Sequence, residues 1–138
     1  MILSSKGEYA LMMLAFMAEH PANGFTTLRD ISNGLELSEK YMETVAKNLV
    51  RGGLLSAVRG KGGGYQFRRS PEQITLWEVL CVTEGELKIT NDLRNTPVVN
   101  WQLQSIMQGL DRSIREYLTR YTIYDLVQRE QSGDDYVI

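Results

Sequence analysis

Two groups of glycines in the middle of the chain, at 52–53 and 60–64, limit what it can fold into. Before the first group, apolar side chains recur at the three- and four-residue spacing of one helix face: Met42, Val45 and Leu49. Ser38 can cap such a helix, because its hydroxyl accepts hydrogen bonds from the free amides of the first turn. Glycine readily takes the left-handed conformation that follows helix ends. We therefore expect a helix over residues 38–51.

The second glycine group separates two short apolar segments, residues 54–58 and 65–67, in which apolar and polar side chains partly alternate. This pattern predicts a β-hairpin with a narrow tip that offers Arg59 and Lys61 to a partner. A glycine-rich loop can also cradle a nucleotide phosphate, but the spacing here lacks the order of the P-loop motif. The hairpin is therefore the favoured interpretation.

Two further helices are predicted before this stretch. The first begins with a capping box at Ser5–Glu8 and stops at Pro21. The second opens with a similar pattern at Thr27, and Asn33-Gly34 is expected to end it. Two short helices joined by a tight turn, the second of them basic, form a helix-turn-helix, and the added hairpin makes a winged helix. The predicted fold is mainly α with a small β-hairpin wing.

Charge is distributed unevenly along the chain. Between Lys40 and Arg69 there are seven cations and one anion, Glu43, whereas the whole chain has a net charge of −2. The remainder therefore carries −8. A basic segment confined to one helix and one hairpin favours an anionic partner, and duplex DNA presents one negative charge per ~1.7 Å of axis. An arginine at the hairpin tip also suits a minor groove only ~6 Å wide.

The second half of the chain predicts a means of pairing two copies. A capping box at Thr75–Glu78 opens a short apolar helix, and a polar segment follows it. A long helix is expected from Pro97, because apolar residues then recur at steps of three and four: Val99, Leu103, Ile106, Leu110, Ile114, Tyr117 and Tyr121. Such a helix has little core of its own, so we expect a homodimer interface along this stripe. The alternative is that the stripe packs back on the first domain.

These patterns predict a winged helix-turn-helix domain over residues 1–82, a linker loop over 83–96, and a last segment over 97–138 that contains the dimerisation helix and a short C-terminal helix opening at Thr122. The single cysteine, Cys81, excludes an internal disulfide, and no export signal is evident, so we expect a cytoplasmic protein. No stretch supplies the ~20 apolar residues of a membrane span. No nucleophile–base pair or metal-ligand spacing emerges, which excludes the usual enzyme classes.

Four segments carry a resemblance to a known family. Residues 4–11, 37–43, 53–65 and 74–80 read SSKGEYAL, LSEKYME, GLLSAVRGKGGGY and ITLWEVL. In these segments the sequence resembles the Rrf2 family of bacterial winged-helix transcription regulators. The likeness is close over residues 1–86 and extends to the long helix only as a pattern of apolar residues.

The resemblance implies a homodimer that binds a near-palindromic operator in double-stranded DNA and regulates transcription, and we expect a repressor. It places the recognition helix, 38–51, in the major groove and the wing, 59–64, in the minor groove. The matching DNA-contact positions are Ser38, Lys40, Tyr41, Glu43, Thr44 and Arg59, and Lys6 is a further candidate for a phosphate contact. Three further cations are expected to contact phosphate: Lys47, Arg51 and Lys61.

The chain departs from the family in two places. Position 8, where the family usually has arginine, is Glu8. Family members that hold an iron–sulfur cluster carry three cysteines before the dimerisation helix, whereas residues 91–104 contain none. Because such clusters are held mainly by cysteine thiolates, we expect no metal and no cofactor. The alternative is a cluster held by non-cysteine ligands such as Glu8.

The regulatory signal has three candidate sources: a small-molecule effector near the linker, a partner protein, or oxidation of Cys81. The alternative function is a protein-interaction module, in which the winged helix no longer binds DNA and the acidic remainder recruits a partner. The retained cations Lys40, Arg59 and Lys61 favour DNA over this alternative.

Overall fold

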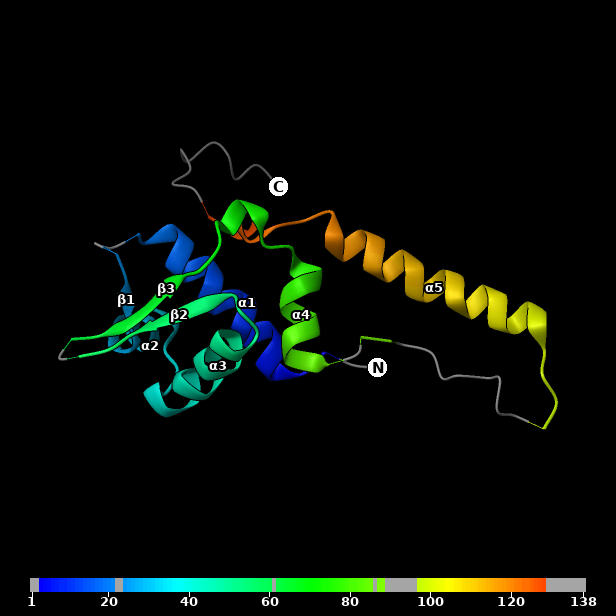
Figure 1. The fold of residues 1–138 in the computed structure, drawn as a ribbon, viewed down its shortest axis with the longest axis horizontal. Coiled ribbons are helices and arrows are strands. Elements are labelled where there is room, and N and C mark those ends of the chain that lie inside the picture. The colour runs from blue at the N-terminus through cyan, green and yellow to red at the C-terminus, as the bar shows by residue number, and fades with distance from the viewer. Residues whose placement is uncertain (1–2, 22–23, 61, 86, 89–96, 129–138) are drawn as a thin grey trace, which may run out of the picture.

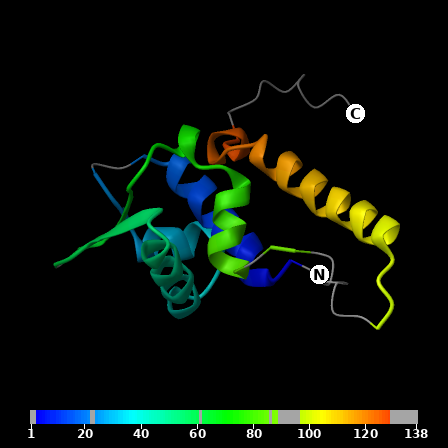
Figure 2. The same cartoon turned by 45° about the vertical axis from the view of Figure 1, so that its right-hand side comes forward.

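Helix α1 (Ser5–Glu19) runs through the middle of the helical domain and contacts α2 (Leu28–Leu35), α3 (Glu39–Arg51) and α4 (Leu76–Glu84). Figures 1 and 2 show these helices around α1, with a small sheet beside them and the long helix α5 (Trp101–Thr119) extending away. The computed structural model describes residues 3–21, 24–60, 62–85, 87–88 and 97–128.

The first helix begins one residue before the predicted position. Ser4 is the N-cap, and its hydroxyl accepts a hydrogen bond from the Gly7 N–H at 3.1 Å. The capping box predicted at Ser5–Glu8 is therefore wrong by one residue. The two adjacent serines offer the same chemistry, so the local sequence does not separate them. The helix ends at the His20 cap, directly before the predicted stop at Pro21.

The turn between α2 and α3 is made differently from the prediction. Gly34 lies inside α2, where a β-carbon would meet the Phe16 ring at 2.2 Å, so glycine lets α1 and α2 pack closely. The residue that ends α2 is Glu36, which takes the left-handed conformation with φ at 56°. The Leu37 N–H donates to the Ser32 carbonyl at 3.1 Å, and the Ser32 hydroxyl donates to the Leu37 carbonyl. The tight turn is thus present without the predicted glycine.

The predicted hairpin is confirmed and is extended by a third strand. Strand β2 (Leu55–Val58) pairs antiparallel with β3 (Gly64–Phe67), with Ser56 opposite Gln66. Strand β1 (Thr26–Thr27) pairs with the other edge of β3, giving the order β1-β3-β2. Glycine ends α3 as predicted, and Gly53 has a φ of 81°. The hairpin therefore leaves α3 through a turn of two residues.

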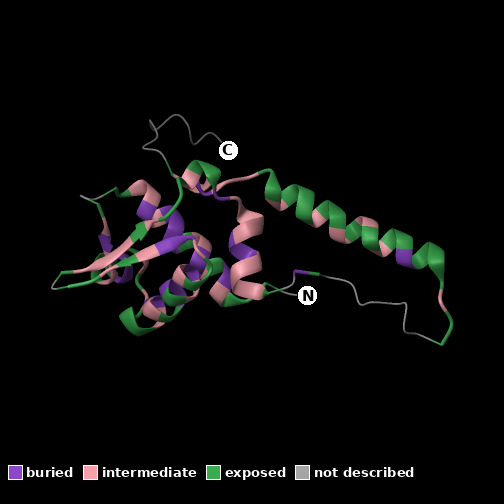
Figure 3. Cartoon of the chain, in the orientation of Figure 1, coloured by how far each residue is buried: buried purple, intermediate pink, exposed green. Residues whose placement is uncertain are grey.

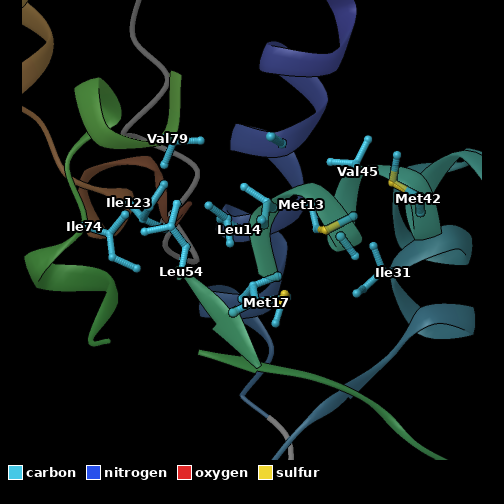
Figure 4. Packing of buried hydrophobic residues seen from close by; sticks show 14 residues of the cluster. Met13, Leu14, Met17, Ile31, Met42, Val45, Leu54, Ile74, Val79 and Ile123 are labelled. Carbon is cyan, nitrogen blue, oxygen red and sulfur yellow. The ribbon is translucent and has the colours of Figure 1, made fainter. Parts of the chain in front are cut away.

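The core gathers around the buried face of α1. Figure 4 shows Met13 facing the side chains of α2 and α3, whereas Leu14 faces Leu54 and Ile123. The largest fully buried side chains come from α1, α2, α3, β2, α4 and the segments around Ile74 and Ile123: Met13, Leu14, Ile31, Met42, Leu49, Leu55, Ile74, Leu80, Ile123, Val45 and Val79. Burying a side chain of this size stabilises the fold by about 1.5–3 kcal/mol relative to exposing it. The recognition helix is therefore anchored by its apolar face.

The capping box predicted at Thr75 is confirmed. The Thr75 hydroxyl accepts from the Glu78 N–H at 3.1 Å, and Glu78 accepts from the Thr75 N–H at 3.4 Å. The Glu78 carboxylate also accepts hydrogen bonds from both terminal nitrogens of the Arg69 guanidinium. The guanidinium donates a further hydrogen bond to the Gln73 carbonyl at 2.9 Å. Arg69 is the second residue after β3, so this pair ties the end of the wing to the start of α4.

Helix α5 is shorter than predicted. It begins at Trp101, with Asn100 as N-cap accepting from the Leu103 N–H at 3.0 Å, and not at Pro97. Val99 therefore lies before the helix and Tyr121 lies beyond its last residue, Thr119. The spacing of apolar residues predicted too long a helix, because the segments on both sides of α5 also contain apolar residues at that spacing. The helix predicted at Thr122 is a 3-10 turn, Ile123–Leu126, which buries Ile123.

Most of α5 is exposed to solvent, as Figure 3 shows. Its C-terminal half contacts α4, where the Arg115 guanidinium lies 5.7 Å from the centre of the Trp77 ring. Ile114 is half-buried, whereas four other residues of the stripe are exposed: Leu103, Ile106, Leu110 and Tyr117. The stripe is thus not covered by packing back on the first domain. Among the described residues, no helix is long and apolar enough to cross a bilayer.

Replacing Glu78 with glutamine is expected to lower the free energy of unfolding at pH 7 by about 1 kcal/mol, because the pair with Arg69 is partly exposed. Hydrogen bonds from Arg69 hold the pKa of Glu78 below its ordinary value. The unfolded chain therefore binds this proton more tightly than the folded protein does. The contribution is present above the unfolded pKa of about 4.3 and is lost as the pH falls through the lower folded-state pKa.

Urea unfolding at pH 7 and pH 3, at one protein concentration, measures this contribution. The difference between wild type and Glu78→Gln should shrink at pH 3. Glu72→Gln is the matched control, since the Glu72 side chain is exposed in a nearby turn. An equal difference at both pH values would contradict the role given to the carboxylate.

Candidate nucleic-acid interface

The N-terminal turn of α3 is held by Ser38. Its hydroxyl accepts a hydrogen bond from the Tyr41 N–H at 3.1 Å, so the predicted cap is confirmed. The hydroxyl hydrogen remains available to a partner, because the cap uses only the oxygen as acceptor. Ser38 and Lys40 are exposed at the same end of the helix. This end therefore presents a donor and a cation to solvent.

The next turns of α3 carry a charged pair. Lys47 Nζ lies 2.9 Å from Glu43 Oε1, and this hydrogen bond raises the pKa of Lys47. The Thr44 hydroxyl donates to the Lys40 carbonyl at 3.1 Å, one turn back. Both groups are held within the helix but stay near its surface, since Thr44 and Lys47 are exposed and Glu43 is half-buried. The face thus offers an acceptor and a donor fixed side by side.

Tyr41 contacts a residue that the sequence did not single out. Its ring meets the Tyr9 ring of α1 edge to face, with 5.5 Å between the ring centres. Both tyrosines are half-buried. Aromatic pairs in this arrangement contribute about 0.5–1.5 kcal/mol beyond the area they bury. Tyr41 therefore joins the recognition helix to α1 as well as facing the surface.

The wing ends in a turn with an exposed arginine. Arg59 follows β2 and is exposed, and the Gly63 N–H donates to the Gly60 carbonyl at 3.0 Å to close the turn. Gly60 has a φ of 112°, a conformation that other residues rarely adopt. Lys61, the second predicted cation of the tip, lies outside the described residues.

The inner face of the wing lies beside α3, as Figure 1 shows. Tyr65, on β3, has its pKa raised chiefly by burial. The nearby Glu43 carboxylate raises it further, and the Lys47 ammonium opposes this. The phenol is thus within the electrostatic field of the pair on α3. Wing and recognition helix form one continuous surface.

Not all of the cations in the basic segment, residues 40–69, are available to a partner. Arg69 faces Glu78 of α4, and Lys47 pairs with Glu43, so two of the seven cations already have partners. Among the described residues, the other exposed cations on α3 and the hairpin are Lys40, Arg51, Arg59 and Arg68. Lys6 is half-buried in the first turn of α1, near the contact between Tyr9 and Tyr41. The positive surface therefore combines α3 with the wing.

The residues present do not fit an iron–sulfur cluster of the cysteine-ligated type. The whole chain has one cysteine, Cys81, which is half-buried in α4. Burial raises the pKa of its thiol, the Arg115 guanidinium opposes this, and the Glu78 carboxylate adds to it. A neutral thiol is a poor metal ligand and a poor nucleophile. Across the described ranges, no three histidine, cysteine or acidic side chains come close enough to hold a metal ion.

This surface has the dimensions and charge that a DNA duplex requires. An α-helix fits a major groove ~12 Å wide, and a narrow hairpin tip with an arginine fits the minor groove. Lysine and arginine side chains recognise guanine or phosphate, and a carboxylate can accept from cytosine. The side chains that carry these groups come from two segments, the N-terminal turns of α3 and the tip of the wing, about twenty positions apart in the chain.

Known proteins show the same sequence pattern over nearly the whole chain. A model of the Rrf2 family, described as an iron-dependent transcriptional regulator, matches residues 3–129. A putative HTH-type transcriptional regulator, ORF2 of Azotobacter vinelandii, is 31% identical over 137 residues, which cover 97% of this chain and 84% of the relative. The HTH-type regulator CymR of Bacillus subtilis is 30% identical over 127 residues, covering 88% and 92%.

Solved structures agree with this relationship. The structure of CymR (YrzC), the global cysteine regulator of B. subtilis, matches with a TM-score of 0.78 at 28% identity, covering 91% of this chain and 95% of that one. The structure of IscR from T. potens matches with a TM-score of 0.73 at 29% identity, covering 99% and 97%. The chain therefore belongs to the Rrf2 family and is a DNA-binding transcriptional regulator with a winged-helix fold, not an enzyme.

Proposed function

We propose that the protein is a sequence-specific repressor that binds a near-palindromic operator as a homodimer in the cytoplasm. The observation that carries this proposal is the contact between α3 and the first strand of the wing, since both elements carry exposed cations: Lys40 and Arg51 on α3, and Arg59 on the wing. In the proposed complex, residues 38–51 enter the major groove and residues 59–64 enter the minor groove. The winged-helix domain, 1–82, binds DNA, residues 83–96 link it to α5, and residues 97–138 pair the copies.

The side chains of this surface divide into two roles. Lys40 and Glu43 can read base edges, since lysine donates to guanine and a carboxylate accepts from the cytosine amino group. Ser38, Tyr41 and Thr44 lie on the same helix and complete its groove-facing surface. The remaining cations are proposed to contact phosphate, which sets orientation and register: Lys6, Lys47, Arg51 and Lys61. Arg59 is proposed to enter the minor groove.

Pairing through α5 is supported by the exposure of its apolar stripe. Leu103 is 41% exposed, Ile106 66%, Leu110 43% and Tyr117 55%. Burying each of these partly exposed leucine and isoleucine side chains would contribute part of the roughly 1.5–3 kcal/mol that full burial of an exposed side chain supplies. A two-fold axis through this stripe would bury the same residues on both copies. Two recognition helices would then face two half-sites about one helical turn apart.

Replacing Arg59 with alanine is expected to weaken DNA binding by about tenfold or more at physiological salt. Because the proposed dimer carries the change twice, the slope of log affinity against log salt should also fall by about 1.8, the value for two lost phosphate neutralisations. Fluorescence anisotropy with duplex DNA from the protein's own upstream promoter measures both quantities.

Arg112→Ala provides the matched control for this substitution. It removes the same charge from an exposed position on α5, far from the wing. Wild-type affinity in Arg59→Ala, or an equal loss in Arg112→Ala, would exclude a specific role for the wing arginine.

Replacing Ile106 with aspartate is expected to shift the protein from dimer to monomer, because two carboxylates would face each other in an apolar interface. The dissociation constant of the dimer should rise by at least about a hundredfold. Sedimentation velocity across a range of concentrations measures it. Gln108→Asp places the same charge on an exposed position outside the stripe and should leave the dimer intact. A dimer that withstands Ile106→Asp would show that the stripe is not the interface.

A further inference from the structure

The end of α4 is bonded to the beginning of α1. Glu84, the last residue of α4, accepts a hydrogen bond from the Ser4 N–H at 3.2 Å and another from the Ser4 hydroxyl at 2.5 Å. Both bonds reach the same carboxylate oxygen across 80 positions of sequence. Ser4 is the N-cap of α1, so the carboxylate lies at the positive end of that helix. A single side chain thus closes the N-terminus of α1.

Gly7 allows this contact to form. It is buried, and a β-carbon at this position would lie 2.5 Å from Glu84 Oε1 and 3.2 Å from Leu80 Cδ2. The Gly7 N–H also donates to the Ser4 hydroxyl oxygen at 3.1 Å. The cap of α1, the glycine beneath it and the carboxylate of α4 therefore form one close contact, which we name the α1–α4 junction (Ser4, Gly7 and Glu84).

The junction lies at the point where the chain leaves the winged-helix domain. Gly85 follows Glu84 directly and ends α4 with a φ of 78°. Figure 2 shows the end of α4 beside the beginning of α1. The contact that Glu84 makes therefore joins the last turn of α4 to the first turn of α1.

On its other side, the junction leads to the recognition helix. The first two turns of α1 carry Lys6, a proposed phosphate contact, and Tyr9. The Tyr9 ring packs edge to face on Tyr41 of α3, 5.5 Å between centres. Glu84 and α3 are thus joined by a short path through the first two turns of one helix.

We propose that Glu84 is a positioning residue for DNA binding. It holds the first turn of α1 so that Lys6 reaches the DNA backbone while Tyr9 supports Tyr41 in the recognition helix. This inference rests on the proposed function and extends it, because it names a residue outside the DNA-facing surface that holds part of that surface in place.

The negative charge of Glu84 lets a DNA-binding measurement separate positioning from simple electrostatics. Glu84→Ala removes a negative charge and, by electrostatics alone, would strengthen binding to DNA. We expect the opposite: an affinity loss of about tenfold, with the salt slope reduced by about 1.8 because each copy of the dimer loses one phosphate contact. Glu84→Gln keeps a side-chain oxygen that accepts from Ser4, so it should restore most of the affinity. Glu72→Ala, with the same change in charge at an exposed turn, should bind at least as tightly as wild type.

Two further measurements separate positioning from general damage to the fold. In the Lys6→Gln background, Glu84→Ala should weaken binding less than about twofold further, since both changes remove the same contact. Hydrogen exchange of residues 3–9 in the full-length protein without DNA should rise in Glu84→Ala and stay low in Glu84→Gln.

The results distinguish this inference from the proposed function. Wild-type affinity and slope in Glu84→Ala, or effects of Glu84→Ala and Lys6→Gln that simply add, would overturn the positioning role while leaving DNA binding intact. Unchanged exchange at residues 3–9 would overturn it as well. If the wild-type protein fails to bind DNA, the proposed function falls, and the positioning role falls with it.

Discussion

The structure depends on the packing of α1 against the apolar faces of α2, α3 and α4. Met13 and Leu14 lie side by side on α1 but face different parts of the core, one toward α2 and α3 and the other toward the hairpin and the C-terminal turn. A protein interior is close-packed, so a shift of α1 is felt by every element it touches. The orientation of the recognition helix is therefore set from beneath by α1, not by contacts within the helix-turn-helix alone.

Electrostatics then separates the charged groups that build the domain from those that remain for a partner. Arg69 and Glu78 tie the wing to α4, and Glu43 with Lys47 orders the middle of α3. The other exposed cations that the structure describes between residues 40 and 69 also lie on α3 and the hairpin, and on α3 Lys40 and Arg51 share the helix face of the Glu43–Lys47 pair. A surface pair contributes little to stability, so these pairs matter mainly because they change how much positive charge is left for a partner.

Features with a local cause were predictable from the sequence. The caps at Ser38 and Thr75, the glycine stop after α3 and the hairpin all depend on residues within a few positions of one another. These local preferences also placed the basic residues on a helix and a wing. The three-stranded sheet was only partly predictable, because β1 is two residues long and is defined by its pairing with β3.

Features decided by distant contacts were not predictable. Gly34 looked like a helix stop, yet it serves the approach of the Phe16 ring from α1, and Glu36 makes the turn instead. Arg69 looked like part of the basic surface, but its carboxylate partner lies on α4. Tyr9 and Glu84 gave no signal as site residues, because their roles arise only when α1 meets α3 and α4.

The central claim is that two copies of this winged helix, joined through α5, bind one duplex together. The most direct measurement selects binding sites from random duplex DNA with the full-length protein and then maps the contacts by hydroxyl-radical footprinting. The account predicts an enriched motif with two-fold symmetry, protected in two half-sites 10–10.5 base pairs apart or a multiple of that spacing. Enrichment of a single asymmetric half-site, or of no motif, would contradict it.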